Sequence, residues 1–256
     1  MSNTPKTVWI TGAGKGIGRA LALKMAADGW AVAASARTSE DLDTLAQEVA
    51  ASNVIGAIHS YPLDIVDIEG NENVLTQIER DLGPLSLAVL NAGTHQAMSA
   101  SEFSVNTVRH LVETNLMGTV NGLGALLPVF RGRKSGRIAV VSSVAGYRGL
   151  PTSAAYGATK AALINMVEAM KPELDKEGVS LSLINPGFVE TPLTDKNEFP
   201  MPFLVTAEEA ASTIYQGLNA GKFEIVFPRR FAFLMKLLRI LPNRLLFSVT
   251  SRMITA

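Results

Sequence analysis

The sequence predicts an α/β protein with one doubly wound parallel sheet of about seven strands and helices on both faces of that sheet. Short apolar segments alternate with helix-like segments along most of the 256 residues, which is the order that produces a parallel sheet. Segments such as Ile138-Ala139-Val140-Val141 are apolar at every position, as expected for strands that helices cover on both sides. A glycine-rich turn follows the first apolar segment, where a strand would pass into a helix.

The expected strands are apolar and β-branched runs bounded by turn residues. They are Thr7–Thr11, Ala31–Ser35, Val54–Leu63, Leu85–Leu90, Ile138–Ser142, Val179–Ile184 and Phe223–Val226. The expected helices lie between them, at Gly16–Asp28, Glu40–Ala51, Ile68–Leu82, Val105–Phe130, Ala154–Lys176 and Ala207–Leu218. Capping residues support two of these helix starts, with Thr38 or Ser39 before Glu40 and Thr206 before Ala207.

Composition excludes several classes of protein. The chain has no cysteine, which excludes a disulfide framework and a thiolate metal site or nucleophile. Its histidines, His59, His95 and His110, lack metal-ligand spacing, so we expect no metal and ordinary surface or partly buried roles. The 23 basic and 23 acidic residues balance, and we expect no nucleic-acid partner. Without a signal-peptide pattern or a run of about 18 uncharged apolar residues, a cytoplasmic location is the expectation.

The glycine-rich turn is the first candidate binding site. It carries Thr11, Gly12, Gly14, Lys15, Gly16, Ile17 and Gly18. Glycines there permit a tight turn and a close approach of the backbone to a pyrophosphate, while the following helix offers free N–H groups and partial positive charge. The spacing Gly12-x-x-x-Gly16-x-Gly18 differs from the common G-x-G-x-x-G, but its place after the first strand predicts nucleotide binding.

The end of the second expected strand indicates which nucleotide binds. An acid there would bind the ribose 2′-hydroxyl of NAD, but the sequence has Ala36 followed by Arg37. Arg37 and Lys15 together would bind a 2′-phosphate, which favours NADP(H). The alternative leaves Arg37 in solvent and lets Glu40 or Asp41 bind the ribose, so NAD(H) stays open.

Tyr156 and Lys160 are four residues apart in an expected helix, so they lie one turn apart on the same face. A phenol has an unperturbed pKa of about 10. An ammonium held beside it would lower that pKa and make the tyrosine a usable proton donor or acceptor. A solvated helix face produces the same spacing, so the pair alone does not establish catalysis.

Six short motifs occur in the order found in the short-chain dehydrogenase/reductase family, which the chain resembles over about residues 6 to 195. They are Thr11-Gly12…Gly16-x-Gly18, Asn91-Ala92-Gly93, Asn115, Ser142-Ser143, Tyr156-x-x-x-Lys160 and Pro186-Gly187. Each motif is modest alone, and six in order are specific. The resemblance implies a single-domain Rossmann-type fold, a nicotinamide cofactor, and hydride transfer between that cofactor and a carbonyl or alcohol.

The resemblance assigns catalytic roles to four residues. Tyr156 would be the general acid/base at the substrate oxygen, and Lys160 would lower the Tyr156 pKa and bind the nicotinamide ribose. Ser143, rather than Ser142, stands 13 residues before Tyr156 and would hold the substrate oxygen. Asn115 would anchor a water that links Lys160 to solvent, although an asparagine inside a helix can equally make a local backbone hydrogen bond or mark a bend.

The segments that follow the third, fourth and sixth strands would complete the cofactor site. The residues involved are Asp64, Ile65, Asn91, Ala92, Gly93, Pro186, Gly187, Val189 and Thr191. Asp64 would meet the adenine amino group, with Ile65 next to it in the same cofactor-binding segment. The next three would leave room for the adenosine ribose, and the last four would reach the carboxamide. Without the resemblance, Asp64 equally suits a helix cap, and the asparagine-alanine-glycine segment suits a plain strand-ending turn.

These assignments predict an NADPH-dependent carbonyl reductase or alcohol dehydrogenase. One alternative is an NAD-dependent alcohol dehydrogenase working in the oxidative direction. Another is a non-catalytic NADP(H)-binding regulatory or membrane-surface protein, for which a broken Ser/Tyr/Lys set would be expected. The partner is a small-molecule carbonyl or alcohol, expected to be apolar from the candidate pocket residues Tyr147, Leu150, Phe188, Leu193 and the 195–203 loop.

The chain departs from the family pattern after residue 227, which divides it into a catalytic domain, 1–227, and an extension, 228–256. The extension has six cations and no acid, against 17 cations and 23 acids elsewhere. Pro242 would break it into two short amphipathic helices. These helices either cover the pocket or a subunit surface, or make peripheral membrane contact through 229–254. The extension makes the family's usual tetramer doubtful, and we expect a homodimer through the Val105–Phe130 and Ala154–Lys176 helices.

Overall fold

The computed structural model describes residues 6–195 and 201–254, so part of the candidate 195–203 pocket loop lies outside the described residues. The strands are β1 (Thr7–Thr11), β2 (Ala31–Ser35), β3 (Ala57–Ser60), β4 (Leu85–Leu90), β5 (Arg137–Val141), β6 (Ser180–Pro186) and β7 (Glu224–Phe227). They form one sheet in the order β3-β2-β1-β4-β5-β6-β7, and every neighbouring pair is parallel. The predicted fold class is confirmed.

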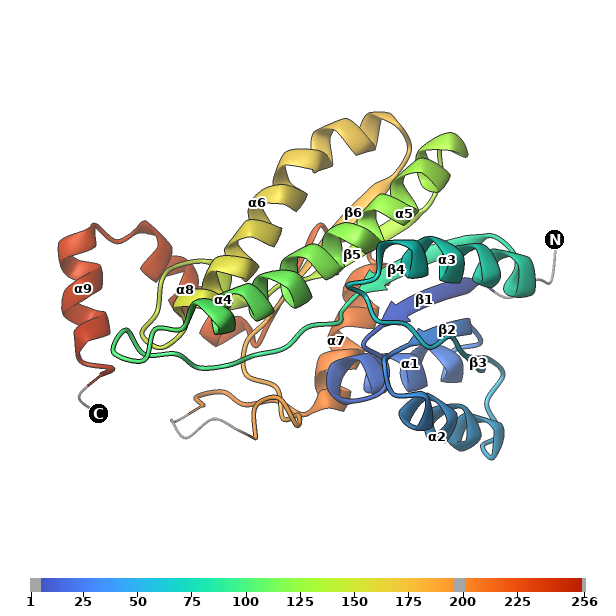
Figure 1. Ribbon diagram of the computed structural model, residues 1–256, viewed down its shortest axis with the longest axis horizontal. Helices are drawn as coiled ribbons and strands as arrows, with labels where there is room; N and C mark the ends of the chain where they lie inside the picture. The colour runs from blue at the N-terminus through green and yellow to red at the C-terminus, as the bar shows by residue number, and fades with distance from the viewer. Residues whose placement is uncertain (1–5, 196–200, 255–256) are drawn as a thin grey trace.

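Helices cover both faces of this sheet (Figure 1). On one face, α1 (Gly16–Ala27), α2 (Ser39–Ala50) and α7 (Ala207–Asn219) share an apolar cluster with the strands. On the other face, α3 (Ile68–Leu82), α5 (Gly118–Gly132) and α6 (Ala154–Lys176) contribute to a second cluster that includes the fully buried Trp9 and Phe130. Since both faces are covered, inner strands such as β1, β2 and β5 are buried along almost their whole length, and only the edge strands β3 and β7 alternate in burial.

The order of the strands determines where a ligand crevice opens at the edge of the sheet. The chain runs outward from β1 through β2 to β3 and then returns to β4 on the other side of β1. At such a switch point the connections leave the sheet in opposite directions, and a crevice opens beyond the carboxyl ends of the strands. The glycine-rich turn after β1 and the Asn91-Ala92-Gly93 segment after β4 face each other across this point.

Two predicted element boundaries need correction. The strand expected at Val54–Leu63 is limited to Ala57–Ser60, although the Tyr61 and Leu63 N–H groups still donate to the Ala34 and Ala36 carbonyls beyond its end, at 2.9 and 3.0 Å. The helix expected at Val105–Phe130 is three segments: α4 (Val105–Leu111), the π-helical η1 (Val112–Met117) and α5. A π-helical insertion of this kind follows from tertiary contacts of its side chains and is frequent at functional sites.

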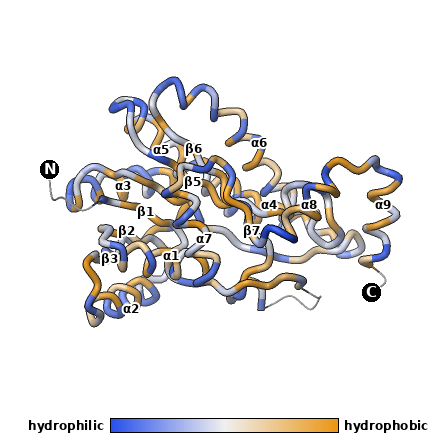
Figure 2. Tube along the Cα trace, turned by 180° about the vertical axis from the view of Figure 1, so that it is seen from behind, coloured by the Kyte–Doolittle hydropathy of each residue, from blue (hydrophilic) through white to orange (hydrophobic). Residues whose placement is uncertain are grey.

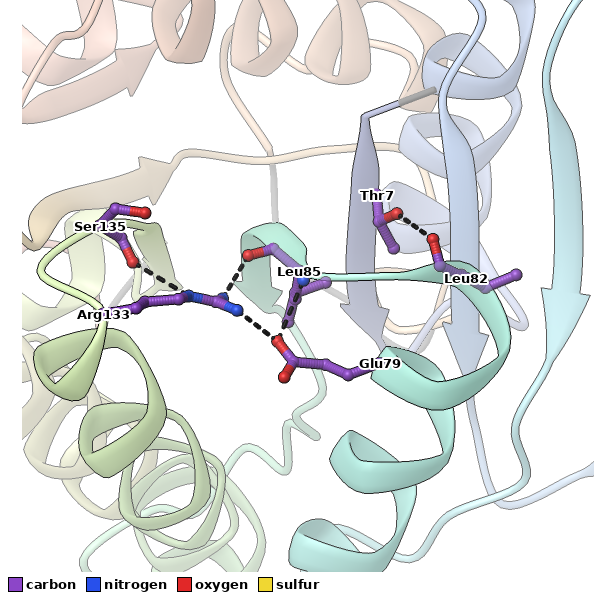
Figure 3. A network of polar contacts seen from close by, with 6 residues as sticks. All are labelled: Thr7, Glu79, Leu82, Leu85, Arg133 and Ser135. Carbon is purple, nitrogen blue, oxygen red and sulfur yellow. Dashed lines mark hydrogen bonds and ion pairs between the residues drawn. The ribbon is translucent and has the colours of Figure 1, made fainter. Parts of the chain in front are cut away.

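A polar network joins α3, β4 and the end of α5 at the amino end of the sheet (Figure 3). The Arg133 guanidinium donates to Glu79 Oε1 at 2.6 Å and to the Leu85 carbonyl, and the Leu85 N–H donates to the same Glu79 oxygen at 3.0 Å. Arg133 Nε also donates to the Ser135 carbonyl at 3.3 Å. Both charged side chains are about one-quarter exposed, so this pair fixes structure at the end of the sheet opposite to the crevice.

The extension after β7 forms two further helices, α8 (Arg229–Ile240) and α9 (Asn243–Ser251), at one end of the molecule. They meet at Pro242, as predicted. The loop that contains the short 3₁₀ turn η2 (Val144–Gly146) contacts α9, since Arg148 donates to Asn243 Oδ1. Figure 2 shows α9 projecting beyond the sheet with apolar residues along its length. Among the described residues, no helix combines the length and apolar character needed to cross a membrane.

Replacing Arg133 by alanine is expected to lower the free energy of unfolding by about 2 kcal/mol, because the partly buried Glu79 carboxylate and the Leu85 carbonyl lose their shared donor. Arg80→Ala is the matched control, since the Arg80 side chain is 72% exposed and a solvent-exposed ion pair contributes little to stability. Urea unfolding of the three proteins measures both changes. Equal losses in the two variants would contradict a specific role for the Arg133 network.

Candidate active site

Lys160 is the most deeply buried charged residue among the predicted site residues, with 4% of its surface exposed. It lies on the second turn of α6, and its ammonium donates a hydrogen bond to the Val141 carbonyl at the end of β5, at 3.1 Å. Burial lowers the pKa of Lys160 to about 8. The lysine is therefore mainly protonated at pH 7 and loses its proton about one pH unit higher.

Tyr156 lies one turn before Lys160 on α6, and the two side chains face the same way, as predicted. The Lys160 ammonium is 5.7 Å from the centre of the Tyr156 ring. Burial raises the pKa of Tyr156 above that of a free phenol, and a hydrogen bond with Ser143 lowers it. The structure thus differs from the expectation that Lys160 lowers the Tyr156 pKa. The ammonium bonds to the Val141 carbonyl, and burial has the larger effect on the phenol.

The two serines after β5 have different roles: Ser142 bonds to α6, and Ser143 faces the candidate site. The Ser142 hydroxyl donates to the backbone carbonyl of Lys160 at 2.8 Å and so attaches α6 to the sheet. The Ser143 hydroxyl accepts from the Ala145 N–H at 3.1 Å, donates to the Pro186 carbonyl at 3.4 Å, and interacts with Tyr156. Ser143, the residue selected from the sequence, is therefore the serine that faces the tyrosine.

Asn115 is fully buried within the π-helical segment η1. Its side chain accepts from the Thr94 N–H at 2.7 Å and donates to the Thr94 carbonyl at 2.9 Å and to Thr159 Oγ1 at 3.3 Å. These bonds hold the segment after β4 against α6. The helix is irregular at Asn115, as the sequence analysis allowed. Asn115 also lies close to Lys160, as the resemblance implied.

Gly93 lies between Asn115 and Lys160. A methyl group at this position would come within 3.1 Å of Asn115 Oδ1 and 3.5 Å of Lys160 Nζ. A larger side chain would therefore displace one of the two polar groups, so the small residue at position 93 keeps the amide oxygen and the ammonium close to each other.

The glycine-rich turn makes close backbone contacts that exclude side chains. A methyl group on Gly18 would lie 2.3 Å from the Gly12 carbonyl oxygen, and Gly16, at φ +56°, lies against Thr191. Lys15 occupies the N-cap position of α1 without a side-chain cap, so the first N–H groups of the helix are free to bind an anion.

A cavity of about 460 Å³ opens at the carboxyl ends of the strands, a volume typical of ligand sites. Fifteen predicted site residues line it: Gly12, Lys15, Gly16, Ile17, Arg37, Asn91, Ala92, Gly93, Ser143, Tyr156, Lys160, Pro186, Gly187, Val189 and Thr191. Together with the uncapped α1 terminus, this lining fits a nicotinamide dinucleotide, with phosphate-binding N–H groups at one end and the tyrosine at the other.

Six predicted site residues do not line the cavity. They are Thr11, Gly14, Gly18, Asp64, Ile65 and Asn115. Thr11 supports the site from behind, since its hydroxyl accepts from the Asn91 and Ala92 N–H groups at 3.0 and 3.1 Å. Asp64 is exposed and accepts from the Val66 N–H at 3.1 Å. The buried Ile65 packs against Gly118 of α5.

The two cations proposed for a 2′-phosphate both line the cavity, but a carboxylate lies beside one of them. The Lys15 ammonium is 3.2 Å from Asp41 Oδ2, and a methyl group on Gly14 would touch the Asp41 side chain at 3.0 Å. Arg37 is exposed. The arginine, the lysine and the alternative acid considered from the sequence thus gather at the same end of the cavity.

His95 is a site residue that the sequence analysis did not single out. Its ring meets the Tyr156 ring edge-on, with centroids 4.7 Å apart, and burial lowers the His95 pKa. Its position, two residues after Gly93 at the carboxyl end of β4, is the signal that could have identified it. Among the described residues no cluster of His, Asp or Glu is suited to a metal ion.

The candidate substrate residues separate into two groups. Leu193 lines the cavity, as expected. Tyr147 is buried, and its hydroxyl donates to Glu224 of β7, so it supports the sheet edge rather than the cavity wall. Phe188 stacks on Phe231 of α8, with ring centroids 5.3 Å apart. A second hollow, of about 910 Å³, lies between α7 and β7 and has none of the predicted site residues in its lining.

Comparison with known proteins supports a redox function. The model of the short chain dehydrogenase family matches residues 6–200. An uncharacterized oxidoreductase of Myxococcus xanthus is 35% identical over 248 residues, which cover 97% of each chain.

Two solved structures share the fold. An alcohol dehydrogenase of Thermococcus sibiricus, complexed with 5-hydroxy-NADP, aligns with a TM-score of 0.76 and 26% identity over 87% of this chain and 95% of that one. A short-chain dehydrogenase/reductase of Burkholderia phymatum in complex with NAD aligns with a TM-score of 0.83 and 22% identity over 93% of this chain and 94% of that one.

Replacing Lys160 by methionine should change how stability depends on pH. The lysine has a pKa of about 8 when folded and about 10.4 when unfolded, so the folded protein releases this proton first. Below pH 8 the ammonium is buried in its charged form, and this lowers the free energy of unfolding by the full amount. The penalty disappears as the pH rises to about 10.4. Relative to Lys160→Met, the wild type should therefore gain about 3 kcal/mol of unfolding free energy across that range.

Urea unfolding at a series of pH values measures this gain. Lys176→Met removes an exposed lysine from the end of the same helix and serves as the control for the loss of a lysine. Parallel stability curves for the wild type and Lys160→Met between pH 8 and 10.4 would show that Lys160 is not buried as an ammonium.

Proposed function

This chain belongs to the short-chain dehydrogenase family of oxidoreductases, and we propose that it is an NADPH-dependent carbonyl reductase, reversible as an alcohol dehydrogenase. The observation that carries the proposal is the arrangement of Ser143, Tyr156 and Lys160 along one wall of the glycine-lined cavity. A nicotinamide bound there supplies the hydride in reduction and accepts it in oxidation. The protein must then hold the substrate oxygen and move one proton.

Tyr156 is the proton donor in the direction of reduction. Burial keeps its phenol protonated, and a phenol donates best to an oxygen on which negative charge is developing. The Ser143 hydroxyl, which already interacts with Tyr156, holds the same oxygen and stabilises that charge. Lys160, protonated at neutral pH, lies one turn further along α6 and is the source of a new proton for the phenolate left after proton transfer.

A buried phenolate needs a route for a new proton. Lys160 borders Gly93, and Asn115 lies directly behind that glycine. We propose that Asn115 and the Thr94 backbone hold a water between the lysine and solvent, so that Lys160 passes a proton to Tyr156 and is itself reprotonated. The low Lys160 pKa supports this role, because an ammonium that releases its proton near neutral pH is a more effective relay than an exposed lysine.

The preference for NADPH rests on Arg37 and Lys15 at the outer end of the cavity. Charge-assisted hydrogen bonds from both to a 2′-phosphate would strengthen binding. The Lys15–Asp41 contact favours a second candidate, an NAD-dependent alcohol dehydrogenase in which Asp41 binds the ribose hydroxyls. We favour NADPH because Asp41 is already neutralised by Lys15 while Arg37 remains exposed. A non-catalytic nucleotide-binding role is less well supported, since the Ser/Tyr/Lys set is complete.

We infer an apolar carbonyl substrate, because Leu193 and Val189 line the cavity and the aromatic pair Phe188 and Phe231 lies next to the Gly187 turn. We also infer a homodimer formed through the α4–α5 and α6 surfaces, because the α8–α9 extension would obstruct the further surface that a tetramer needs.

Tyr156→Phe should reduce kcat by about 10³-fold, since it removes the proton donor and keeps the ring. NADPH binding should be nearly unchanged. Tyr215→Phe, which removes a hydroxyl from α7 outside the cavity, is the control and should keep full turnover. The measurements are NADPH consumption with a panel of carbonyls and NADPH titration by fluorescence. Undiminished turnover in Tyr156→Phe would refute the mechanism.

Two substitutions separate the cofactor preferences. Arg37→Leu should raise the KM for NADPH by about tenfold or more, because a charge-assisted phosphate contact is lost, and should leave the KM for NADH unchanged. Asp41→Asn should lower the KM for NADPH by releasing Lys15. Steady-state kinetics with each cofactor test both. If Asp41→Asn instead weakens NADH and Arg37→Leu leaves NADPH unaffected, the enzyme uses NAD(H).

A further inference from the structure

Helix α8 has an inner face that is firmly attached to the domain. Ala232 and Met235 are buried with 3% or less of their surface exposed. Phe231 stacks on Phe188, and Lys236 forms an ion pair with Glu224 of β7. The helix therefore has a fixed orientation on the body of the protein, and its opposite face has a defined direction.

The outer face of α8 is apolar, where a surface helix would ordinarily be polar. Phe233, Leu237 and Ile240 are 69%, 45% and 76% exposed. Their spacing of four and three residues places them on one stripe of the helix, turned away from Met235. On α9, Leu245 and Phe247 are also more than half exposed. Figure 2 shows α8 and α9 next to each other at one end of the molecule.

The charges that accompany this apolar face are all positive. Residues 228–256 carry six cations and no acid, whereas the rest of the chain has six more acids than cations. Arg229 and Arg230 occupy the first turn of α8, which has no acidic residue. Cations at this end interact unfavourably with the helix dipole. An anionic group bound next to Arg229 and Arg230 would offset this repulsion.

We propose that the α8–α9 surface, defined by Phe233, Leu237, Ile240, Leu245 and Phe247 with Arg229, Arg230 and Arg244, binds the surface of an anionic lipid bilayer. The apolar side chains enter the interface between headgroups and acyl chains, and the arginines contact the lipid phosphates. Apolar side chains flanked by cations are the pattern of helices that lie in the plane of a membrane. The attachment is peripheral, since none of the helices in residues 6–195 and 201–254 is long and apolar enough to cross the bilayer.

A second copy of this chain fits the surface less well. In a two-fold contact the same patch is present on both sides, and because residues 228–256 have no acid, the arginines of one extension would find no opposite charge on the other. An anionic bilayer offers phosphates to the arginines and an apolar interior to the stripe of α8. The α8–α9 surface can reach a flat bilayer because it lies at one end of the molecule.

The test is flotation of the full-length protein with vesicles at 0.1 M salt, comparing pure phosphatidylcholine with a mixture containing 30% phosphatidylglycerol. The protein should float with the anionic vesicles and stay with the soluble fraction when the vesicles are neutral. Arg229→Gln/Arg230→Gln/Arg244→Gln should lower the partition coefficient about a hundredfold, since each basic residue near such a surface contributes a factor of about five. Phe233→Ser/Ile240→Ser should lower it by at least tenfold.

Lys176→Gln and Ile55→Ser remove an exposed cation and an exposed apolar side chain elsewhere, and should float as the wild type does. Circular dichroism of each variant verifies folding. Equal binding to neutral vesicles, no binding to anionic vesicles, or unchanged binding of both surface variants would overturn the proposal. So would analytical ultracentrifugation showing a dimer that Phe233→Ser/Ile240→Ser converts to a monomer, because the surface would then be an interface between copies.

Discussion

The burial of one ammonium group constrains the rest of the site. Lys160 can occupy its position only because the Val141 carbonyl accepts a hydrogen bond from it at the end of β5, and an unpaired buried charge would be far more costly. The segment after β4 passes beside it at Gly93, where a side chain would collide with Asn115. Ser142 ties the helix backbone at Lys160 to the sheet. These contacts fix the first turns of α6 and thereby the place of Tyr156.

The two ends of the sheet have different tasks. At the amino end, Arg133 and Glu79 join helices to strands through a network that contains no cavity residue. At the carboxyl end, small residues and free backbone groups leave space for a ligand, at the price of a buried lysine with a lowered pKa. Helix α8 touches this second end through the Phe231–Phe188 stack beside Gly187.

Much of this arrangement could be predicted from local sequence signals. The helix at Ile68–Leu82 and the strand at Leu85–Leu90 have the predicted bounds, because each combines regular periodicity with clear turn residues at its ends. The shared face of Tyr156 and Lys160 follows from helical spacing alone. The π-helical segment could not be predicted, since it depends on the bonds between Asn115 and Thr94 of another segment. The His95 contact, the Lys15–Asp41 pair and the turn of Tyr147 toward Glu224 likewise join residues distant in sequence.

The central claim is that this cavity carries out hydride transfer to a carbonyl with proton donation by the protein. The most direct measurement uses NADPH carrying deuterium at one C4 position, a series of ketones and aldehydes from small to long-chain, and mass spectrometry of the alcohol formed. The account predicts one deuterium at the carbinol carbon from one of the two C4 positions only, together with stoichiometric oxidation of the cofactor. Bound cofactor that is never oxidised with any carbonyl, or an alcohol product without deuterium from either position, would contradict it.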